Sequence, residues 1–349
     1  MDDAMPGRDE QSIMESPLPP LLKVRMSFFH RLKCFIGLWL FKCLASVYFF
    51  YRRLVRRPSS RTRPTLVKRY PCRAMLQTHI FYPPGYTPGE RRPLYINLHG
   101  GGFAVADAQV DDPFCAAWAE RTGMLVVSLD YRKVPRYPFP VAVSDVAAQI
   151  QAVLDDPALP IDEARVSIGG FSAGGNLALA ASQLPPLHGR VQAAVVYYPI
   201  VDFGHPPPVK MASRPYTDGP RDNIGDSGMG WALDWGIVRV GQNRRDPVLS
   251  PCYARAEDLP PRIYMIAAQW DMLRLEAQQM IHRLAGLEDK ADQEAPFDTG
   301  PYKWTLARGC THGFTHGHGG DAAEKASRRE FCGDLYRQAH EWLQRGGLA

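Results

Sequence analysis

The first quarter of this chain lacks negative charge once its first residues are passed. No Asp or Glu occurs between Ser16 and Gly89, whereas Lys and Arg occur fourteen times in that segment. The whole chain has 349 residues and a formal net charge of +5, so residues 90–349, with 26 basic and 31 acidic residues, are mildly acidic. Positive charge confined to one end indicates where the protein is located rather than what it acts on, and we expect no nucleic-acid partner.

Cysteine patterns that hold metals or disulfides are also missing. The seven cysteines are scattered, their number is odd, and no two of them form a C-x-x-C pair. We therefore expect no disulfide framework, no metal site and no cofactor, and most of the cysteines should be small buried apolar residues. This usage favours a reducing compartment, although a domain facing the endoplasmic reticulum with a single bridge remains an open alternative.

One long apolar run is present within the positively charged segment. Residues 34–51 (CFIGLWLFKCLASVYFFY) are apolar around the whole helical circumference apart from Lys42 and Ser46, and basic residues flank them on both sides. Eighteen helical residues span ~27 Å, close to the ~30 Å hydrocarbon core of a bilayer. Lys42 near the middle costs roughly 2.5–3.5 kcal/mol on insertion, which the many large apolar residues can offset.

The sequence therefore predicts three parts: a flexible polar and basic tail over 1–33, a hydrophobic helix over 34–57, and a folded domain over 58–349. The first interpretation of the helix is a single-pass anchor in the endoplasmic reticulum or another intracellular membrane. Two alternatives remain open, namely a helix lying in the membrane interface and a helix that packs on the folded domain and covers a substrate pocket. A cleaved signal peptide is not expected, because the run begins late and no small-residue cleavage site follows it.

Strand-like and helix-like segments alternate through the rest of the chain. Predicted strands cover 77–82, 93–99, 124–131, 165–169, 191–198, 262–268 and 302–307, and predicted helices cover 141–154, 173–183, 273–287 and 322–344. The alternation predicts an α/β fold with a mostly parallel central sheet and helices on both faces. Residues 203–247 hold a Pro run and many Gly and Asp residues, and are too long for a plain connection, so they predict an inserted cap.

Two glycine-rich motifs indicate the chemistry. Residues 170–174 (GFSAG) fit G-x-S-x-G, and because a strand precedes them and a helix follows, Ser172 is placed on a nucleophile elbow. Residues 99–103 (HGGGF) follow another predicted strand and offer backbone N–H groups that no side chain obstructs. The candidate oxyanion donors are the N–H groups of Gly101, Gly102 and Ala173. His99 is expected to be a structural hydrogen-bonding residue that orients the glycine loop.

A serine nucleophile needs a base and an acid that orients the base. In this chain order the acid and then the histidine should each follow a later strand. Asp271 comes after the predicted strand 262–268, and His312 comes after the strand 302–307. We therefore predict a Ser172–Asp271–His312 triad.

Each partner has competitors. Asp258 is a nearby alternative acid, and Asp271 itself could instead cap the helix that follows it. His316 and His318 compete with His312 for the role of the base. His312 is preferred because it comes first after its strand and precedes Gly-Phe.

These motifs resemble those of the hormone-sensitive-lipase group of α/β-hydrolases, which includes bacterial family IV esterases and the membrane-anchored arylacetamide deacetylases. The resemblance rests on six motifs in the same order, namely HGGGF, DYRKVPRYPFPVAVSDV, GFSAGGN, DPVLSP, LPP and THGF. It implies an α/β-hydrolase fold with a cap, the triad Ser172, Asp271 and His312, and ester hydrolysis without a metal. The N-terminal apolar segment is similar to that of the deacetylase branch. Phe171 departs from the pattern, since the group usually has an acidic residue before the nucleophile.

The predicted function is a serine carboxylesterase or deacetylase that hydrolyses a small apolar ester through an acyl-enzyme, with the N-terminal helix at a membrane. One alternative is an acyl transferase or a lactone-forming enzyme that uses the same triad. Another is a non-catalytic small-molecule receptor of the kind found among plant relatives of this group that lack the histidine. The presence of His312 disfavours this second alternative.

Overall fold

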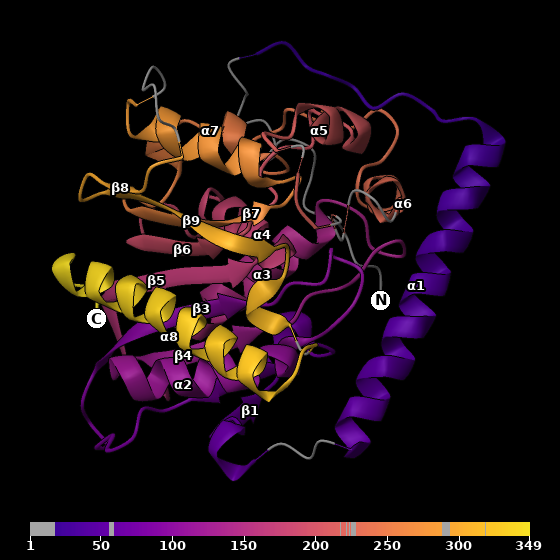
Figure 1. Ribbon diagram of the computed structural model, residues 1–349. Helices are drawn as coiled ribbons and strands as arrows, with labels where there is room; N and C mark the ends of the chain where they lie inside the picture. The colour runs from indigo at the N-terminus through magenta and orange to yellow at the C-terminus, as the bar shows by residue number, and fades with distance from the viewer. Residues whose placement is uncertain are drawn as a thin grey trace.

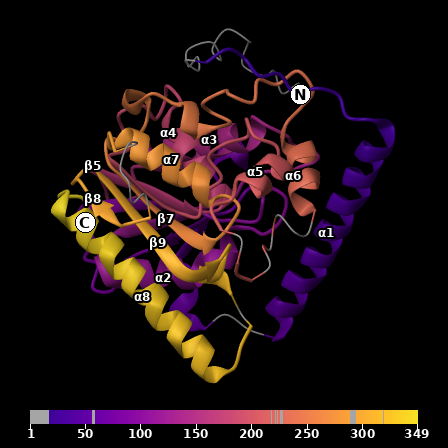
Figure 2. The ribbon, with the colours of Figure 1, turned by 45° about the horizontal axis from the view of Figure 1, so that its top comes forward.

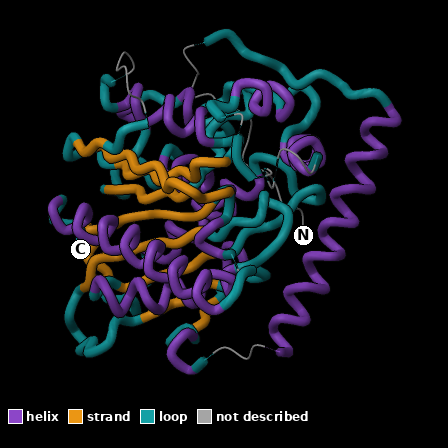
Figure 3. Tube along the Cα trace, in the orientation of Figure 1, coloured by secondary structure: helices purple, strands orange, loops and turns teal. Residues whose placement is uncertain are grey.

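A nine-stranded sheet forms the central layer of the molecule (Figure 1, Figure 3). The computed structural model describes residues 18–55, 59–216, 218–220, 222, 224, 228–287, 294–317 and 319–349. The strand order is β1-β2-β4-β3-β5-β6-β7-β9-β8. The strands are β1 (Leu66–Lys68), β2 (Thr78–Phe81), β3 (Arg92–Leu98), β4 (Leu125–Leu129), β5 (Ile161–Phe171), β6 (Ala193–Tyr197), β7 (Ile263–Trp270), β8 (Phe297–Asp298) and β9 (Tyr302–Thr311).

Most of the sheet is parallel, as the sequence predicts. Strands β4, β3, β5, β6, β7 and β9 run parallel to one another, while β2 runs antiparallel to β4. Strands β1 and β8 add short antiparallel pairs at the two edges. All seven predicted strands are present. The two edge strands are missed because they are only three and two residues long, too short to show a hydrophobic period.

Helices cover both faces of the sheet. One face packs against α3 (Val141–Leu154), α4 (Ala173–Ser182) and α7 (Arg274–Leu284), and the other against α2 (Asp112–Thr122) and α8 (Ala322–Arg345). Strand β3 explains the division, because Leu94 and Ile96 face the first group while Tyr95, between them, faces the second. With both faces buried, the strands are continuous apolar runs rather than alternating ones.

The segment between β6 and β7 includes the predicted insertion 203–247, and we refer to it as the cap. It contains α5 (Pro207–Ser213) and α6 (Met229–Ile237). Two buried ion pairs hold these helices. Lys210 of α5 pairs with Glu276 of α7, and Asp234 of α6 pairs with Arg244 at 2.8 Å.

The apolar N-terminal segment forms one long helix, α1 (Phe28–Val55), that runs along the outer side of the molecule next to α6 (Figure 1, Figure 2). It begins six residues before the predicted start at residue 34, and the predicted last residues 56 and 57 lie outside the described residues. Its inner face is buried on the cap, where Leu38 is fully buried and the thiol of Cys34 donates a hydrogen bond to the carbonyl of Trp231.

Lys42 fixes the middle of α1 to the domain. Its ammonium group donates hydrogen bonds to the carbonyl oxygens of Ala104 and Val134, each at 2.7 Å. Ala104 closely follows the glycine motif, so the helix is attached to the loop that carries Gly101 and Gly102. The lone charge that the sequence presents as a cost of membrane insertion is therefore used in a tertiary contact.

Residues 18–27, which the sequence predicts as part of a flexible tail, are instead held against the cap. Leu22 forms an antiparallel bridge with Asn243, and Lys23 is buried. The Lys23 ammonium donates to both the carboxylate and the backbone carbonyl of Asp234, each at 2.8 Å. The pKa of Lys23 is lowered, because the effect of burial exceeds the opposite effect of the Asp234 carboxylate. The amine is therefore well shielded from water. Sequence patterns do not show this contact because its partners are more than 200 residues apart.

We predict that Lys42→Met weakens the attachment of α1. The variant keeps an apolar side chain of similar length but leaves two carbonyl oxygens without their charged donor, which should lower the free energy of unfolding by about 1–3 kcal/mol. Lys33→Met, the same change at an exposed position of the same helix, is the matched control and should change it by less than ~0.5 kcal/mol. Urea unfolding of both variants measures the difference. Equal effects at the two positions would show that the contacts of Lys42 do not hold the helix.

Candidate active site

Ser172 lies on the sharp turn between β5 and α4. Its φ of 54° and ψ of −115° fall in a region that residues with side chains rarely adopt. The turn is possible because its neighbours are glycines. A Cβ on Gly174 would lie 1.9 Å from the carbonyl oxygen of Leu98, and one on Gly170 would lie 2.5 Å from the same atom. The elbow predicted from G-x-S-x-G is present, and its backbone packs closely against the end of β3.

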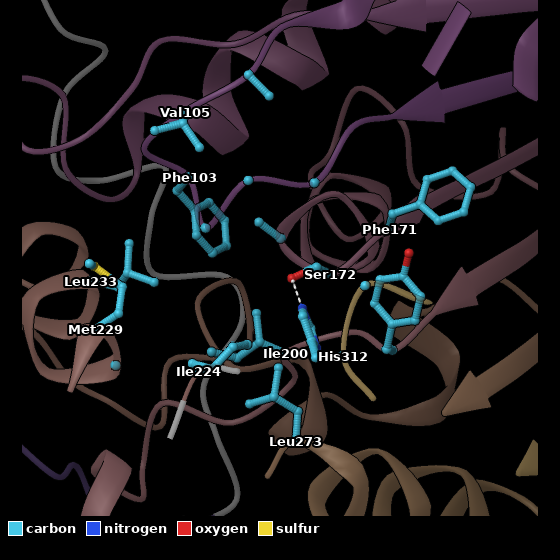
Figure 4. A pocket seen from close by; sticks show the side chains of 18 of the residues that line it. Phe103, Val105, Phe171, Ser172, Ile200, Ile224, Met229, Leu233, Leu273 and His312 are labelled. Carbon is cyan, nitrogen blue, oxygen red and sulfur yellow. Dashed lines mark hydrogen bonds between the residues drawn. The ribbon is translucent and has the colours of Figure 1, made fainter. Parts of the chain in front are cut away.

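Ser172, His312 and Asp271 form one hydrogen-bonded chain. Nε2 of His312 lies 2.8 Å from Oγ of Ser172, drawn as the dashed line in Figure 4, and Nδ1 of His312 lies 2.7 Å from Oδ2 of Asp271. Asp271 is 1% exposed, so its carboxylate is shielded from water. Its other oxygen, Oδ1, accepts a hydrogen bond from the backbone N–H of Leu273. The carboxylate thus both orients the imidazole and accepts from the turn that leads into α7.

The competing residues lie in other contacts. Asp258 forms a salt bridge with Arg255 at 2.7 Å. His316 pairs through Nε2 with the buried Asp111 at 2.8 Å. His318 lies outside the described residues. Of the predicted candidates that the structure describes, Asp271 and His312 are the ones brought to Ser172.

His99 and its neighbours hold the glycine loop in shape, as predicted. Buried His99 contacts the carbonyl of Gly100 through Nδ1 at 2.6 Å and Asp130 through Nε2 at 3.1 Å, and its ring stacks on Tyr131. The Tyr131 hydroxyl donates to the carbonyl of His99. Burial alone would raise the pKa of Asp130, but the contact with His99 and the charge of Lys133 outweigh it and hold that pKa well below its usual range. Asp130 therefore stays a carboxylate that fixes His99.

The glycine loop turns its backbone toward Ser172. Gly101 and Gly102 have φ values of 113° and 60°, and a Cβ on Gly100 would lie 3.6 Å from that of Ser172. Among the hydrogen bonds of the described residues, none uses the N–H groups of Gly101 and Gly102. Ala173 is the first residue of α4, where an N–H has no partner within the helix. All three predicted oxyanion donors line the cavity that contains Ser172 and His312.

That cavity has a volume of about 400 Å³ and mainly apolar walls (Figure 4). Its walls come from the glycine loop, from the cap and from the ends of β6 and β7. They include Phe103, Val105, Ile200, Ile224, Met229, Leu233 and Leu273. Charged and polar side chains, among them Arg52, His205 and Lys210, also line the cavity, but most of its wall is apolar and suits an apolar group.

One wall of the cavity comes from α1, whose residues Phe41, Tyr48, Phe49 and Arg52 line it. This arrangement corresponds to the predicted alternative of a helix covering a substrate pocket. Sequence reasoning does not identify these four residues. The one sequence feature that indicates packing of this helix on the domain is Lys42, a single charge within an apolar helix. A buried amine needs hydrogen-bond acceptors, and a neighbouring protein surface can supply them.

Phe171 has a structural role at the position where the resemblance implies an acid. Its ring is buried, stacks on Tyr197, and meets the ring of His316 edge-on at 4.7 Å. Tyr198, in turn, lies edge-on against His312 at 4.9 Å. Aromatic packing therefore supports the segments that carry Ser172 and His312.

A family model described as having the alpha/beta hydrolase fold matches residues 95–301. The chain belongs to this α/β-hydrolase family. The match includes Ser172 and Asp271 and ends before His312. The resemblance to the hormone-sensitive-lipase group drawn from the six motifs is confirmed.

Related proteins with this hydrolase fold are esterases by name. Carboxylesterase NlhH from Mycobacterium tuberculosis is 29% identical over 208 residues, 57% of this chain and 62% of the relative. Neutral cholesterol ester hydrolase 1 from Rattus norvegicus is 32% identical over 143 residues, 38% of this chain and 35% of the relative. The chain therefore spans less than two thirds of the length of the curated relatives it matches.

Among solved structures, an esterase from Pyrobaculum calidifontis superposes with a TM-score of 0.61 and 26% identity, covering 78% of this chain and 82% of that one. The predicted fold class, a mostly parallel sheet with helices on both faces in the α/β-hydrolase arrangement, is confirmed.

We predict that Gly174→Ala disrupts the site through its backbone. The added methyl group would collide with the carbonyl of Leu98, which cannot move aside as a flexible side chain could, so the free energy of unfolding should fall by about 1–3 kcal/mol or more. Gly333→Ala, in α8 where the methyl group meets open space, is the matched control and should be stabilising by about 0.5–1 kcal/mol. Denaturant unfolding of the two variants measures both effects. A neutral Gly174→Ala would contradict the close approach of α4 to β3.

Proposed function

We propose that this chain is a serine carboxylesterase that hydrolyses an apolar ester. The observation that carries the proposal is the continuous chain of hydrogen bonds from Ser172 through His312 to Asp271, at 2.8 and 2.7 Å, beside backbone N–H groups that face an apolar cavity. The names of the relatives, carboxylesterase and cholesterol ester hydrolase, support the same class of substrate.

Each group has a step that its position supports. His312 accepts the Ser172 hydroxyl proton as Oγ attacks the ester carbonyl, and Asp271 stabilises the resulting imidazolium. The negative charge that develops on the carbonyl oxygen is stabilised by the N–H groups of Gly101, Gly102 and Ala173, each such donor contributing about 2.7–4 kcal/mol. His312 then gives the proton to the leaving alcohol, and an acyl group remains on Ser172.

The second half of the reaction repeats these roles with water. His312 takes a proton from a water molecule, the hydroxide attacks the acyl carbonyl, and the tetrahedral oxyanion is stabilised by the same N–H groups. Collapse of this intermediate releases the carboxylic acid and returns the proton to Oγ of Ser172. The cavity walls accommodate an apolar part of the ester, because apolar side chains such as Phe103, Ile200 and Leu233 line them.

We also propose that α1 associates with a membrane. Its 28 residues are long and apolar enough to cross one, and an intracellular membrane such as the endoplasmic reticulum is the expected location. Apolar esters partition into such membranes, so the location would supply the substrate.

Ser172→Ala should abolish esterase activity. Removing the nucleophile of a serine triad lowers kcat by roughly 10⁴–10⁶-fold, and the hydrolysis of p-nitrophenyl butyrate by purified protein measures the loss. Thermal unfolding of the variant controls for folding. A fluorophosphonate probe should label the unmodified chain and not the variant. Full hydrolysis by Ser172→Ala would overturn the assignment, and failure of the unmodified chain to react would favour a non-catalytic receptor.

His312→Gln and His316→Gln should separate the two paired histidines. His312→Gln removes the base that contacts Ser172, so kcat should fall by at least about 10³-fold. His316→Gln keeps the triad intact and should lower kcat by less than about 10-fold. Steady-state kinetics on the same ester measures both. The reverse ranking would assign the base to His316.

A further inference from the structure

The outward face of α1 is apolar apart from Lys33 near its start. Only 11% of its most apolar 18-residue window is buried. Residues that recur on one side of the helix are more than half exposed, namely Phe29, Ile36, Leu40, Leu44, Val47 and Leu54. Figures 1 and 2 show no other described element outside this face. A stripe of this length on a protein surface marks a place where another apolar phase is in contact.

The opposite face of α1 is fixed to the domain at three points. Lys23 is attached just before the helix, Lys42 is attached at its middle, and Arg53 pairs with Asp107 in its last turn. A helix of 28 residues is ~42 Å long. Because the contacts occur along this length, α1 cannot cross a bilayer while they persist. An apolar phase must therefore meet α1 from the side.

Basic residues near both ends of α1 indicate which apolar phase contacts the helix. Arg25 and Lys33 are exposed near its start, and Arg61 and Arg63 are exposed beyond its end. No acidic residue occurs from Ser16 to Gly89 to balance them. An apolar stripe with aromatic residues and cationic ends fits the interface of a bilayer that contains anionic lipid.

The same helix lines the entrance of the cavity. Tyr48 belongs to the cavity wall and is also 46% exposed, so it lies at the rim. Phe41 and Phe49 continue the apolar wall inward. An ester that reaches Tyr48 from the outer side of α1 is therefore at the edge of the cavity that holds Ser172.

We infer that α1 lies flat in the interface of an anionic bilayer and that the ester enters the cavity from the bilayer past Tyr48. This inference rests on the proposed esterase function for the identity of what enters, but the docking surface stands on the exposure and charge of α1 alone. It makes the membrane contact lateral, through one face of α1, and leaves the other face in its contacts with the cap.

The test uses the full chain and extruded vesicles of phosphatidylcholine with 30% phosphatidylserine. The unmodified chain should sediment with these vesicles and bind pure phosphatidylcholine more weakly. The double variant Leu40→Glu/Leu44→Glu changes two exposed residues that do not line the cavity, and should lower binding by at least about 10-fold. Ala323→Glu/Ala326→Glu on α8, also exposed, adds the same charge elsewhere and should bind like the unmodified chain.

Two esters separate docking from catalysis. Hydrolysis of soluble p-nitrophenyl acetate by Leu40→Glu/Leu44→Glu should stay within about 2-fold of the unmodified chain, while hydrolysis of a long-chain ester carried in the vesicles should fall in proportion to binding. Ser172→Ala should bind vesicles normally and hydrolyse neither ester. If the unmodified chain and both surface variants hydrolyse neither ester, the proposed function is wrong. The vesicle-binding result would still test the docking surface.

Three results would overturn the inference. Unchanged vesicle binding by Leu40→Glu/Leu44→Glu would place the docking surface elsewhere. Resistance of the bound protein to extraction by alkaline carbonate, with release by detergent alone, would show that α1 spans the bilayer. A lipid-free dimer that this double variant converts to a monomer, without vesicle binding by either form, would show that the face contacts a second copy of the chain.

Discussion

The close approach of α4 to the end of β3 is the constraint on which the site depends. The backbone of Gly174 is so near the carbonyl of Leu98 that no side chain fits between them. This contact sets the nucleophile elbow and the glycine loop side by side, because the loop begins at the residue after β3. The strained backbone of Ser172 and the exposed N–H groups of Gly101 and Gly102 are both consequences of it. Ser172, His312 and the residues Gly101, Gly102 and Ala173 consequently line one cavity.

The sheet and the triad could be predicted from the sequence because their determinants are local. Runs of buried apolar residues mark the parallel strands, and each functional residue directly follows a strand whose carboxyl end meets the same edge of the sheet. Asp271 and His312 are 41 residues apart, yet both follow neighbouring strands, β7 and β9. The order of the motifs along the chain was therefore sufficient to predict that these residues lie together.

The position of α1 could not be predicted in the same way. Composition and length describe an apolar helix equally well in a bilayer, at an interface or on a protein surface. What decides among them is the set of partners of Lys23 and Lys42, namely the carboxylate of Asp234 and carbonyl oxygens of loops far along the chain. Phe171 shows the same limit, since only the structure reveals its contacts with the rings of Tyr197 and His316.

Because α1 forms one wall of the cavity, a fragment of the chain needs this helix to enclose the cavity fully. The family match covers residues 95–301, which include Ser172 and Asp271 but neither His312 nor any part of α1. A fragment chosen by that match, or one trimmed of its apolar helix to improve solubility, would have a cavity open on one side. The residues that enclose this cavity thus begin with α1, well before the region that the family model matches.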